Sequence, residues 1–243
     1  MAALTPVASV EALVSAIQKS GLLSADALEK VRAAAAKTSD PKIVVRDLLK
    51  DGTLTKWQAG QLLHGYHQLT LGKYKLLDQL SSSPTGRVYL VEHSQMARRH
   101  TLKVLAKRLA SNPQAVKQFL TAAQNACNLD HRNISHVYDV NQEGDRHYVV
   151  MDHIEGETLE QLIARSGPVK LPQALDFIAQ AAEGLAHAHD NGVVHGDLKP
   201  ANLLRDPSGT LKILEIGQAG IGAAYETENP DEAVETAALA AVR

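Results

Sequence analysis

Apolar residues recur every three or four positions between residues 8 and 66, the spacing of one face of an α-helix. Four residues that commonly cap helices stand where these patterns begin: Ser9, Ser24, Asp40 and Thr55. Thr55 is followed three residues later by Gln58, which predicts a capping box. We therefore expect a module of about four short helices over residues 1–69, anchored by Trp57.

From Lys73 onward, short runs rich in β-branched and aromatic residues predict strands. The five predicted strands cover residues 74–77, 87–91, 101–105, 134–140 and 147–151. A helix is expected from Asn112-Pro113 to about Asn128, between the third and fourth strands. Helical patterns return after Gly156 and include a long apolar helix over residues 172–190. The fold class is therefore α+β.

Composition narrows the function classes. The net charge is −2 with both signs interspersed, so neither nucleic acid nor an anionic membrane surface is expected as a partner. The single cysteine, Cys127, excludes an internal disulfide and a cysteine metal cluster. No basic n-region with an apolar core precedes residue 30, and no apolar run approaches the ~20 residues of a membrane-spanning helix. We expect a cytoplasmic protein that does not enter the membrane.

The most informative stretch runs from Val193 to Leu204 and reads V-V-H-G-D-L-K-P-A-N-L-L. It resembles the catalytic loop of protein kinases, H-R-D-L-K-x-x-N, with Gly196 in place of the arginine. The segment around Leu54-Thr55-Lys56-Trp57-Gln58 also looks like the helical region that precedes the kinase domain in planctomycete-type bacterial serine/threonine kinases.

This resemblance implies a protein-kinase-like two-lobed fold behind the small all-α module. The N-lobe, a five-stranded antiparallel sheet with one helix, and the hinge would occupy residues 70–156. A partial C-lobe with a terminal helix would occupy residues 157–243. That last helix is expected after the capping sequence Asn229-Pro230.

The resemblance also implies roles for the catalytic loop. Asp197 would be the catalytic base, Lys199 the lysine on the γ-phosphate, and Asn202 a magnesium ligand. A purely structural role for these residues is an equal alternative, because Asp and Asn also bond the backbone of their own turn. His195 is expected to be a structural histidine of this loop.

ATP would be held by residues spread along the chain. The implied nucleotide-binding set is Gly86, Val88, Lys103, Met151, Asp152, Ile154 and Leu204. In this family, Lys103 would contact the α- and β-phosphates, and the hinge backbone after Met151 would contact adenine. Val88 and Leu204 are equally suited to be ordinary core residues.

Three parts of this machinery depart from the family pattern. The phosphate loop reads Ser81-Ser82-Ser83-Pro84-Thr85-Gly86, with one glycine of three. The helix glutamate that pairs with the strand lysine is replaced by Ala122, which leaves Lys103 either poorly oriented or simply solvated. The magnesium motif Asp-Phe-Gly reads Glu215-Ile216-Gly217; glutamate keeps the carboxylate but is one methylene longer.

The chain also lacks an Ala-Pro-Glu motif, so the peptide-binding platform of a kinase is not expected. These departures favour a pseudokinase that acts by binding, with weak or absent ATP and Mg²⁺ binding. The alternatives are a weakly active serine/threonine kinase and a scaffold or dimerisation protein that binds no nucleotide. An unidentified protein partner, or a second copy in a homodimer, would dock on the helical module or on the incomplete C-lobe face.

Overall fold

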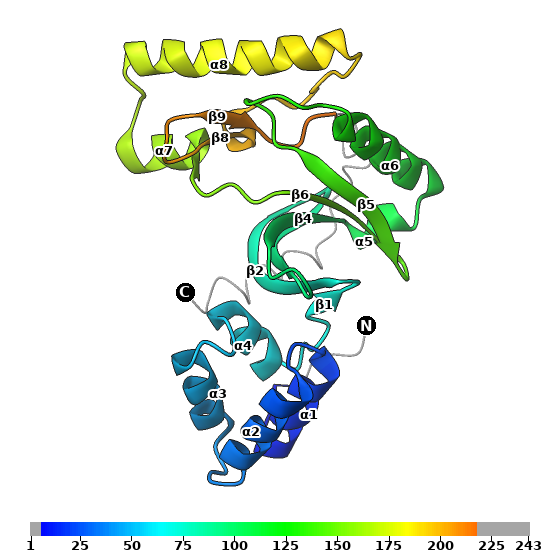
Figure 1. The fold of residues 1–243 in the computed structure, drawn as a ribbon, viewed down its shortest axis with the longest axis vertical. Helices are drawn as coiled ribbons and strands as arrows, with labels where there is room; N and C mark the ends of the chain where they lie inside the picture. The colour runs from blue at the N-terminus through cyan, green and yellow to red at the C-terminus, as the bar shows by residue number, and fades with distance from the viewer. Residues whose placement is uncertain (1–5, 218–243) are drawn as a thin grey trace. The chain divides into compact units, whose positions relative to one another are not determined.

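The computed structural model describes residues 6–217 (Figure 1). The contacts between residues group the described chain into two compact units. The first contains residues 6–80 and 89–99, and the second contains residues 81–88 and 100–217. The helix predicted after Asn229 lies outside the described residues, and the domain boundaries proposed above stay predictions.

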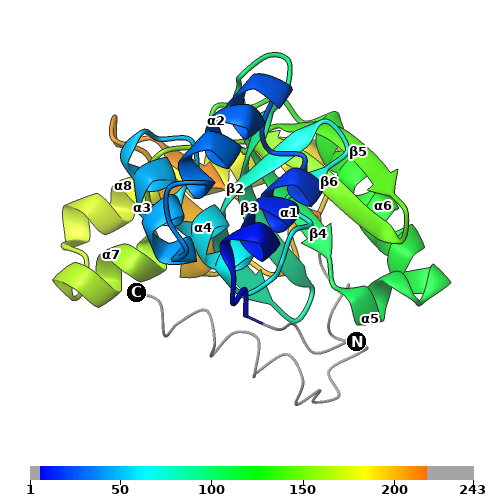
Figure 2. The same cartoon turned by 90° about the horizontal axis from the view of Figure 1, so that it is seen from below.

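The N-terminal module consists of four helices, as predicted: α1 (Val10–Ser20), α2 (Ala25–Ala35), α3 (Pro41–Lys50) and α4 (Lys56–Leu63). Each of the four predicted caps is confirmed, since the cap side chain accepts a hydrogen bond from a first-turn backbone N–H. The helices surround a shared core in which Leu13, Ile17 and Leu62 are almost fully buried. In Figures 1 and 2 they form a small bundle at the blue end of the chain.

Helix α4 is fixed to strand β2 (Tyr74–Ser83) by its capping residues. Thr55 Oγ1 donates to the carbonyl of Leu77 at 2.6 Å, and Gln58 Nε2 donates to the carbonyl of Leu76 at 2.7 Å. The ring of Trp57 lies 5.8 Å from that of Tyr89. The Leu-Thr-x-Trp-Gln sequence is therefore the segment that attaches the helical module to the sheet, and we call this attachment the dock.

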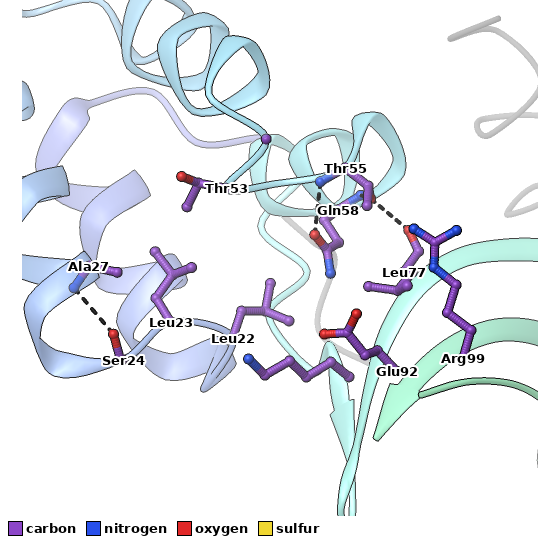
Figure 3. A pocket seen from close by; sticks show the side chains of 12 residues that line it. Leu22, Leu23, Ser24, Ala27, Thr53, Thr55, Gln58, Leu77, Glu92 and Arg99 are labelled. Atoms are coloured by element: carbon purple, nitrogen blue, oxygen red, sulfur yellow. Dashed lines mark hydrogen bonds between the residues drawn. The ribbon is translucent and has the colours of Figure 1, made fainter. Parts of the chain in front are cut away.

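Beside the dock lies a cavity of about 440 Å³ (Figure 3). Its apolar lining comes from Leu22, Leu23 and Leu77, and its polar rim carries Lys75, Glu92 and further side chains. Thr55 and Gln58 stand on its wall with their hydrogen bonds drawn in Figure 3. Specific hydrogen bonds to β2 thus lie directly beside this cavity.

The larger sheet has six strands rather than the five predicted. They are β1 (Thr70–Leu71), β2, β3 (Gly86–His93), β4 (Arg99–Leu105), β5 (Val137–Glu143) and β6 (Arg146–Asp152). The prediction missed β1, which pairs antiparallel with β2, because two residues are too few to show alternation. It also began β5 too early: Ile134 makes only an isolated bridge to Ile213.

The second unit contains β4, β6 and β5, which are antiparallel neighbours in that order, together with several helices. Its helices are α5 (Lys107–Ala110), α6 (Pro113–Cys127), α7 (Leu159–Ser166) and α8 (Leu171–Asp190), with a short 3₁₀ turn at Pro200–Asn202. Helix α6 lies along β5 (Figures 1 and 2). Phe119 and four alanines of α6 face the main core of this unit.

A second, three-stranded sheet was not predicted: β7 (Glu157–Thr158), β8 (Leu203–Arg205) and β9 (Leu211–Ile213). Helix α8 lies against β9 (Figure 1). Another side of α8 exposes Leu171, Leu175 and Ile178 within the described chain, on the C-lobe that was expected to have an incomplete face. No helix between residues 6 and 217 has the length and apolarity needed to cross a bilayer.

Candidate functional site

All predicted site residues belong to the second unit. Three of them meet in the loop before β8. Lys199 Nζ donates to Asp197 Oδ2 at 2.7 Å, and Asn202 Nδ2 donates to the Asp197 carbonyl at 2.8 Å. The hydrogen bond from Lys199 lowers the pKa of Asp197, and the same bond raises the pKa of Lys199. Both side chains are about half exposed, at 55% and 51%, so this carboxylate is ionised at neutral pH and can be reached by a ligand.

His195 has the structural role predicted for it. Its Nδ1 accepts from the Asp197 backbone N–H at 3.2 Å, so Nε2 carries the proton and donates to the Leu214 carbonyl at 3.1 Å. Burial lowers the pKa of His195, which keeps the ring neutral and this tautomer fixed. The histidine therefore joins the catalytic loop to the residue before Glu215.

Lys103 and Glu215 form the central ion pair of the site. Lys103 Nζ lies 3.0 Å from Glu215 Oε2, and the two side chains are 2% and 27% exposed. The interpretation of Lys103 as a solvated lysine is therefore wrong. The lysine is buried in strand β4 with a carboxylate beside it, because burying an ammonium without compensation is costly.

The partner of Lys103 does not come from helix α6. Ala122 occupies the expected position on that helix and is buried in the apolar core. Its carbonyl oxygen lies 3.4 Å from where a Cβ on Gly217 would stand, so α6 and the turn at 215–217 are close neighbours. Glu215 itself has a φ of 56°, a left-handed conformation that is unfavourable for a residue with a side chain.

The segment that matches the phosphate loop is a tight hairpin between β2 and β3. Its two-residue turn is Pro84-Thr85. The Thr85 carbonyl accepts from the backbone N–H of Ala106 at 3.0 Å, and the Pro84 carbonyl accepts from Arg108 Nη2 at 3.0 Å. These bonds hold the hairpin onto the start of α5, and Pro84 at its turn has no backbone N–H to offer a phosphate.

The surviving glycine of this loop has a role that the sequence did not show. A Cβ on Gly86 would stand 2.1 Å from the carbonyl oxygen of Val104. Only glycine lets the two backbones approach so closely. Gly86 was assigned to nucleotide binding from its place in the motif. In the structure its missing side chain allows the backbones of β3 and β4 to pack closely.

The hinge follows β6. Met151 is buried in the core, and the Asp152 carboxylate is occupied, accepting from the Tyr138 hydroxyl at 2.6 Å and the His136 N–H at 3.3 Å. Ile154 is half-buried, and its backbone N–H and C=O have no hydrogen-bond partner among residues 6–217. A donor and an acceptor side by side on a half-buried backbone match the edge of an adenine ring.

Val88 and Leu204 are half-buried on β3 and β8. Their roles in an adenine slot stay predictions. The structure brings the predicted residues together in two groups: Lys103 with Glu215, and Asp197 with Lys199 and Asn202. Since the Leu214 N–H donates to the Asn202 carbonyl at 2.9 Å, the two groups are tied by the backbone.

Two residues of the site region were missed. Arg108 anchors the hairpin and Tyr138 anchors the hinge aspartate. Arg108 carries no sequence signal beyond a basic residue after a strand. The pairing of Lys103 with Glu215 had a signal: a lysine within the apolar run Leu102–Leu105 lacks its usual glutamate, while a longer acid stands at the position of the family's aspartate.

A family-model comparison matches residues 74–240 to the protein kinase domain. The chain belongs to the protein kinase domain family. The resemblance seen in the catalytic loop is thereby confirmed, and so is the two-lobed kinase-like fold class, with the strand count corrected to six.

Curated relatives are bacterial serine/threonine-protein kinases. The chain is 36% identical to PrkC of Bacillus subtilis over 148 residues, which are 61% of this chain and 23% of PrkC. It is 34% identical to PknA of Mycobacterium tuberculosis over 153 residues, or 61% of this chain and 36% of PknA. The matched part thus spans about a quarter to a third of these relatives.

Among solved structures, the kinase domain of Mycobacterium tuberculosis PknI superposes with a TM-score of 0.57 at 27% identity. The superposition covers 62% of this chain and 61% of the PknI chain. The kinase family uses ATP and Mg²⁺. Whether the residues of this kinase domain suit these two groups is therefore a question of geometry and charge.

The adenine end of ATP fits, since the Ile154 backbone N–H and C=O have no hydrogen-bond partner between residues 6 and 217. The lysines at 103 and 199 would meet the phosphates. A bare Mg²⁺ does not fit. Asn202 and Glu215 have oxygen donors of the right kind, but Lys103 already balances the charge of Glu215, and Lys199 that of Asp197. The two lysines and the two carboxylates of these pairs together carry no net negative charge.

Proposed function

We propose that this chain is a pseudokinase: a protein-kinase-like domain that binds rather than phosphorylates. The observation that carries the proposal is the Pro84-Thr85 hairpin. A kinase holds the phosphates of ATP under a glycine-rich loop whose backbone N–H groups face them. Here the remaining glycine, Gly86, packs against the backbone of Val104, and the hairpin carbonyls accept hydrogen bonds from Ala106 and Arg108.

Phosphoryl transfer depends on positioning and on charge stabilisation rather than on covalent chemistry. Losing the phosphate loop removes positioning, and pairing both carboxylates with lysines removes the negative charge that would attract the metal. A misplacement of ~1 Å in such a site costs on the order of 100-fold in rate. We expect transfer by this chain to be undetectable or very slow.

Nucleotide binding itself is retained in the proposal. Ile154 would receive adenine through backbone groups that have no partner in the described part of the chain, while the half-exposed Lys199 would meet a phosphate. When bound, ATP would supply a transferable phosphoryl group, but this chain's residues would only hold and orient it. The affinity is expected to be weak because the phosphates lack their loop.

Incubation with radiolabelled ATP, Mg²⁺ and a generic protein substrate tests the absence of transfer. Wild type and Asp197→Asn are compared in parallel. The proposal expects no label above the level of Asp197→Asn. Labelling by wild type that Asp197→Asn abolishes would overturn it, whereas labelling that both share would come from a contaminating kinase.

A weakly active serine/threonine kinase is the second candidate, favoured by one observation. The group of Asp197, Lys199 and Asn202 is intact, and Asp197 is ionised and accessible. In that case Asp197 would accept the proton of a substrate hydroxyl. The labelling experiment separates the two candidates directly.

The binding partner is proposed to be a protein that docks on the helical module or on the exposed face of α8, with self-association as an alternative. The exposed leucines and isoleucine of α8 form an apolar stripe of the kind that marks contact surfaces. Size-exclusion chromatography with light scattering would detect a dimer. A monomer at all concentrations would leave a heterologous partner as the proposal.

A further inference from the structure

We infer that Glu215 is the positioning residue of Lys103, taking over the role of the glutamate that helix α6 lacks, and that it does not serve primarily as a magnesium ligand. The site would then take a nucleoside phosphate without a divalent metal. This last part rests on the proposed function, whereas the pairing itself does not.

The burial of Lys103 makes a nearby carboxylate necessary. The Lys103 side chain is 2% exposed, and Lys103 pairs with Val149 where β4 and β6 run antiparallel. Glu215 Oε2, at 3.0 Å, supplies the negative charge. Removing one partner of such a pair takes the compensating charge away from a buried ion, which is strongly destabilising.

The length of the Glu215 side chain is consistent with this role. The family's aspartate at this position is one methylene shorter, and the position on α6 that usually holds the lysine's partner is Ala122. The two departures compensate for each other: Ala122 removes the carboxylate of α6, and the longer side chain of Glu215 supplies one to Lys103 instead. The left-handed backbone at Glu215 marks a residue that the surrounding structure holds in place despite strain.

A consequence follows for regulation. In kinases the lysine pair is made or broken as the helix equivalent to α6 moves. Here both partners lie outside α6, on β4 and in the turn after β9. A movement of α6 would therefore not switch the pair, and the charge at Lys103 stays matched in the unliganded protein.

Thermal unfolding of the unliganded full chain tests the pairing without any nucleotide. Glu215→Gln is expected to lower Tm by roughly 8 °C. Lys103→Met/Glu215→Gln should recover more than half of that loss, because no buried charge then remains. Glu183→Gln, an exposed change on α8, is the matched control and should leave Tm unchanged. A double variant no more stable than Glu215→Gln would overturn the inference.

A carboxylate introduced on α6 should replace Glu215 if the role of Glu215 is to position Lys103. A merely structural role for Glu215 predicts no such replacement. Ala122→Glu added to Glu215→Gln should raise Tm by several degrees and restore ATP-induced stabilisation, while Ala122→Gln should do neither. If Ala122→Glu disrupts the core, the Lys103→Met cycle still decides the pairing.

Failure of the two ideas can be told apart. If the variants behave as expected but ATP never shifts Tm, the pairing stands and nucleotide binding fails. If ATP shifts Tm and Glu215→Gln is as stable as wild type, nucleotide binding stands and the role assigned to Glu215 is wrong.

Discussion

The capping side chains of the dock in the first unit and the hinge backbone of the nucleotide site in the second differ in how their polar atoms are paired, although the Trp57 Nε1 of the dock is itself buried without a hydrogen-bond partner among the described residues. In the dock, the Thr55 and Gln58 side chains make all their bonds within the protein, to each other's backbone and to the carbonyls of β2. In the site, Ile154 keeps a backbone donor and acceptor without a partner among the described residues. Satisfied buried groups contribute stability, whereas unsatisfied ones provide the capacity to bind a ligand.

The difference predicts that changes in the dock reduce stability and leave ligand binding alone, while changes in the site do the reverse. Gly86 and the Lys103–Glu215 pair are exceptions: they belong to the site, but their contacts are made within the protein, so changing them is expected to reduce stability. Four variants, taken from the largest expected effect to the smallest, test this division.

Gly86→Ala is expected to destabilise the protein by about 3 kcal/mol, because the new Cβ would meet the Val104 carbonyl at 2.1 Å. Chemical denaturation measures this cost. Gly60→Ala is the control: nothing lies within 4 Å of its Cβ, and alanine favours the helix. Gly86→Ala folding as stably as wild type would return Gly86 to the ligand-binding residues.

Gln58→Met is expected to cost about 2 kcal/mol, since it removes the buried bonds to the Leu76 carbonyl and the Thr55 N–H. Denaturation should show the loss, while the Tm shift produced by ATP should match that of wild type. Gln124→Met, at an exposed position of α6, should change neither quantity. A smaller ATP shift in Gln58→Met would show that the dock influences the site.

Lys199→Met is expected to weaken ATP binding about 10-fold, or about 1.4 kcal/mol, with little change in unfolding free energy. The reason is that the Asp197–Lys199 pair is half exposed and contributes little stability, yet its cation meets the phosphate. Titration calorimetry measures the affinity, and Lys117→Met on the exposed surface of α6 is the control. Equal affinities in the two variants would remove Lys199 from the site.

His195 should give a small pH dependence of stability. Burial lowers its pKa in the folded state, so between pH 6.5 and the lowered value the unfolded chain binds more protons. The contribution is present above pH 6.5 and is lost as the pH falls, by less than about 1.4 kcal/mol per pH unit. Denaturation at pH 7.5 and 5.5 should therefore show a larger loss for wild type than for His195→Asn; equal losses would contradict it.

The sequence predicted the dock region well because its signals are local. Helix caps and the capping box act within four positions, and each lies where it was expected. Trp57 as an anchor was also predicted, although its contact with Tyr89 could not be. The small sheet of β7, β8 and β9 was missed because strands of two or three residues have no periodicity to detect.

The site was predicted only in part. Motif spacing placed Asp197, Lys199 and Asn202 together, and the structure shows them in contact. The partner of Lys103 was not predicted, because an ion pair between residues 112 positions apart follows from the folded geometry and not from local sequence. Gly86 was misassigned for the same reason: its neighbour, Val104, is on another strand.

The central claim is that the site binds nucleotide without operating as a magnesium-dependent kinase. Thermal unfolding with millimolar ATP, in EDTA and in Mg²⁺, tests it most directly, since a ligand present at 100 times its Kd stabilises a protein by about 2.7 kcal/mol. The account predicts a modest upward shift of Tm that is the same in both buffers. A shift that appears or grows with Mg²⁺ would contradict it, because Glu215 and Asn202 would then hold a metal–nucleotide complex as an active kinase does.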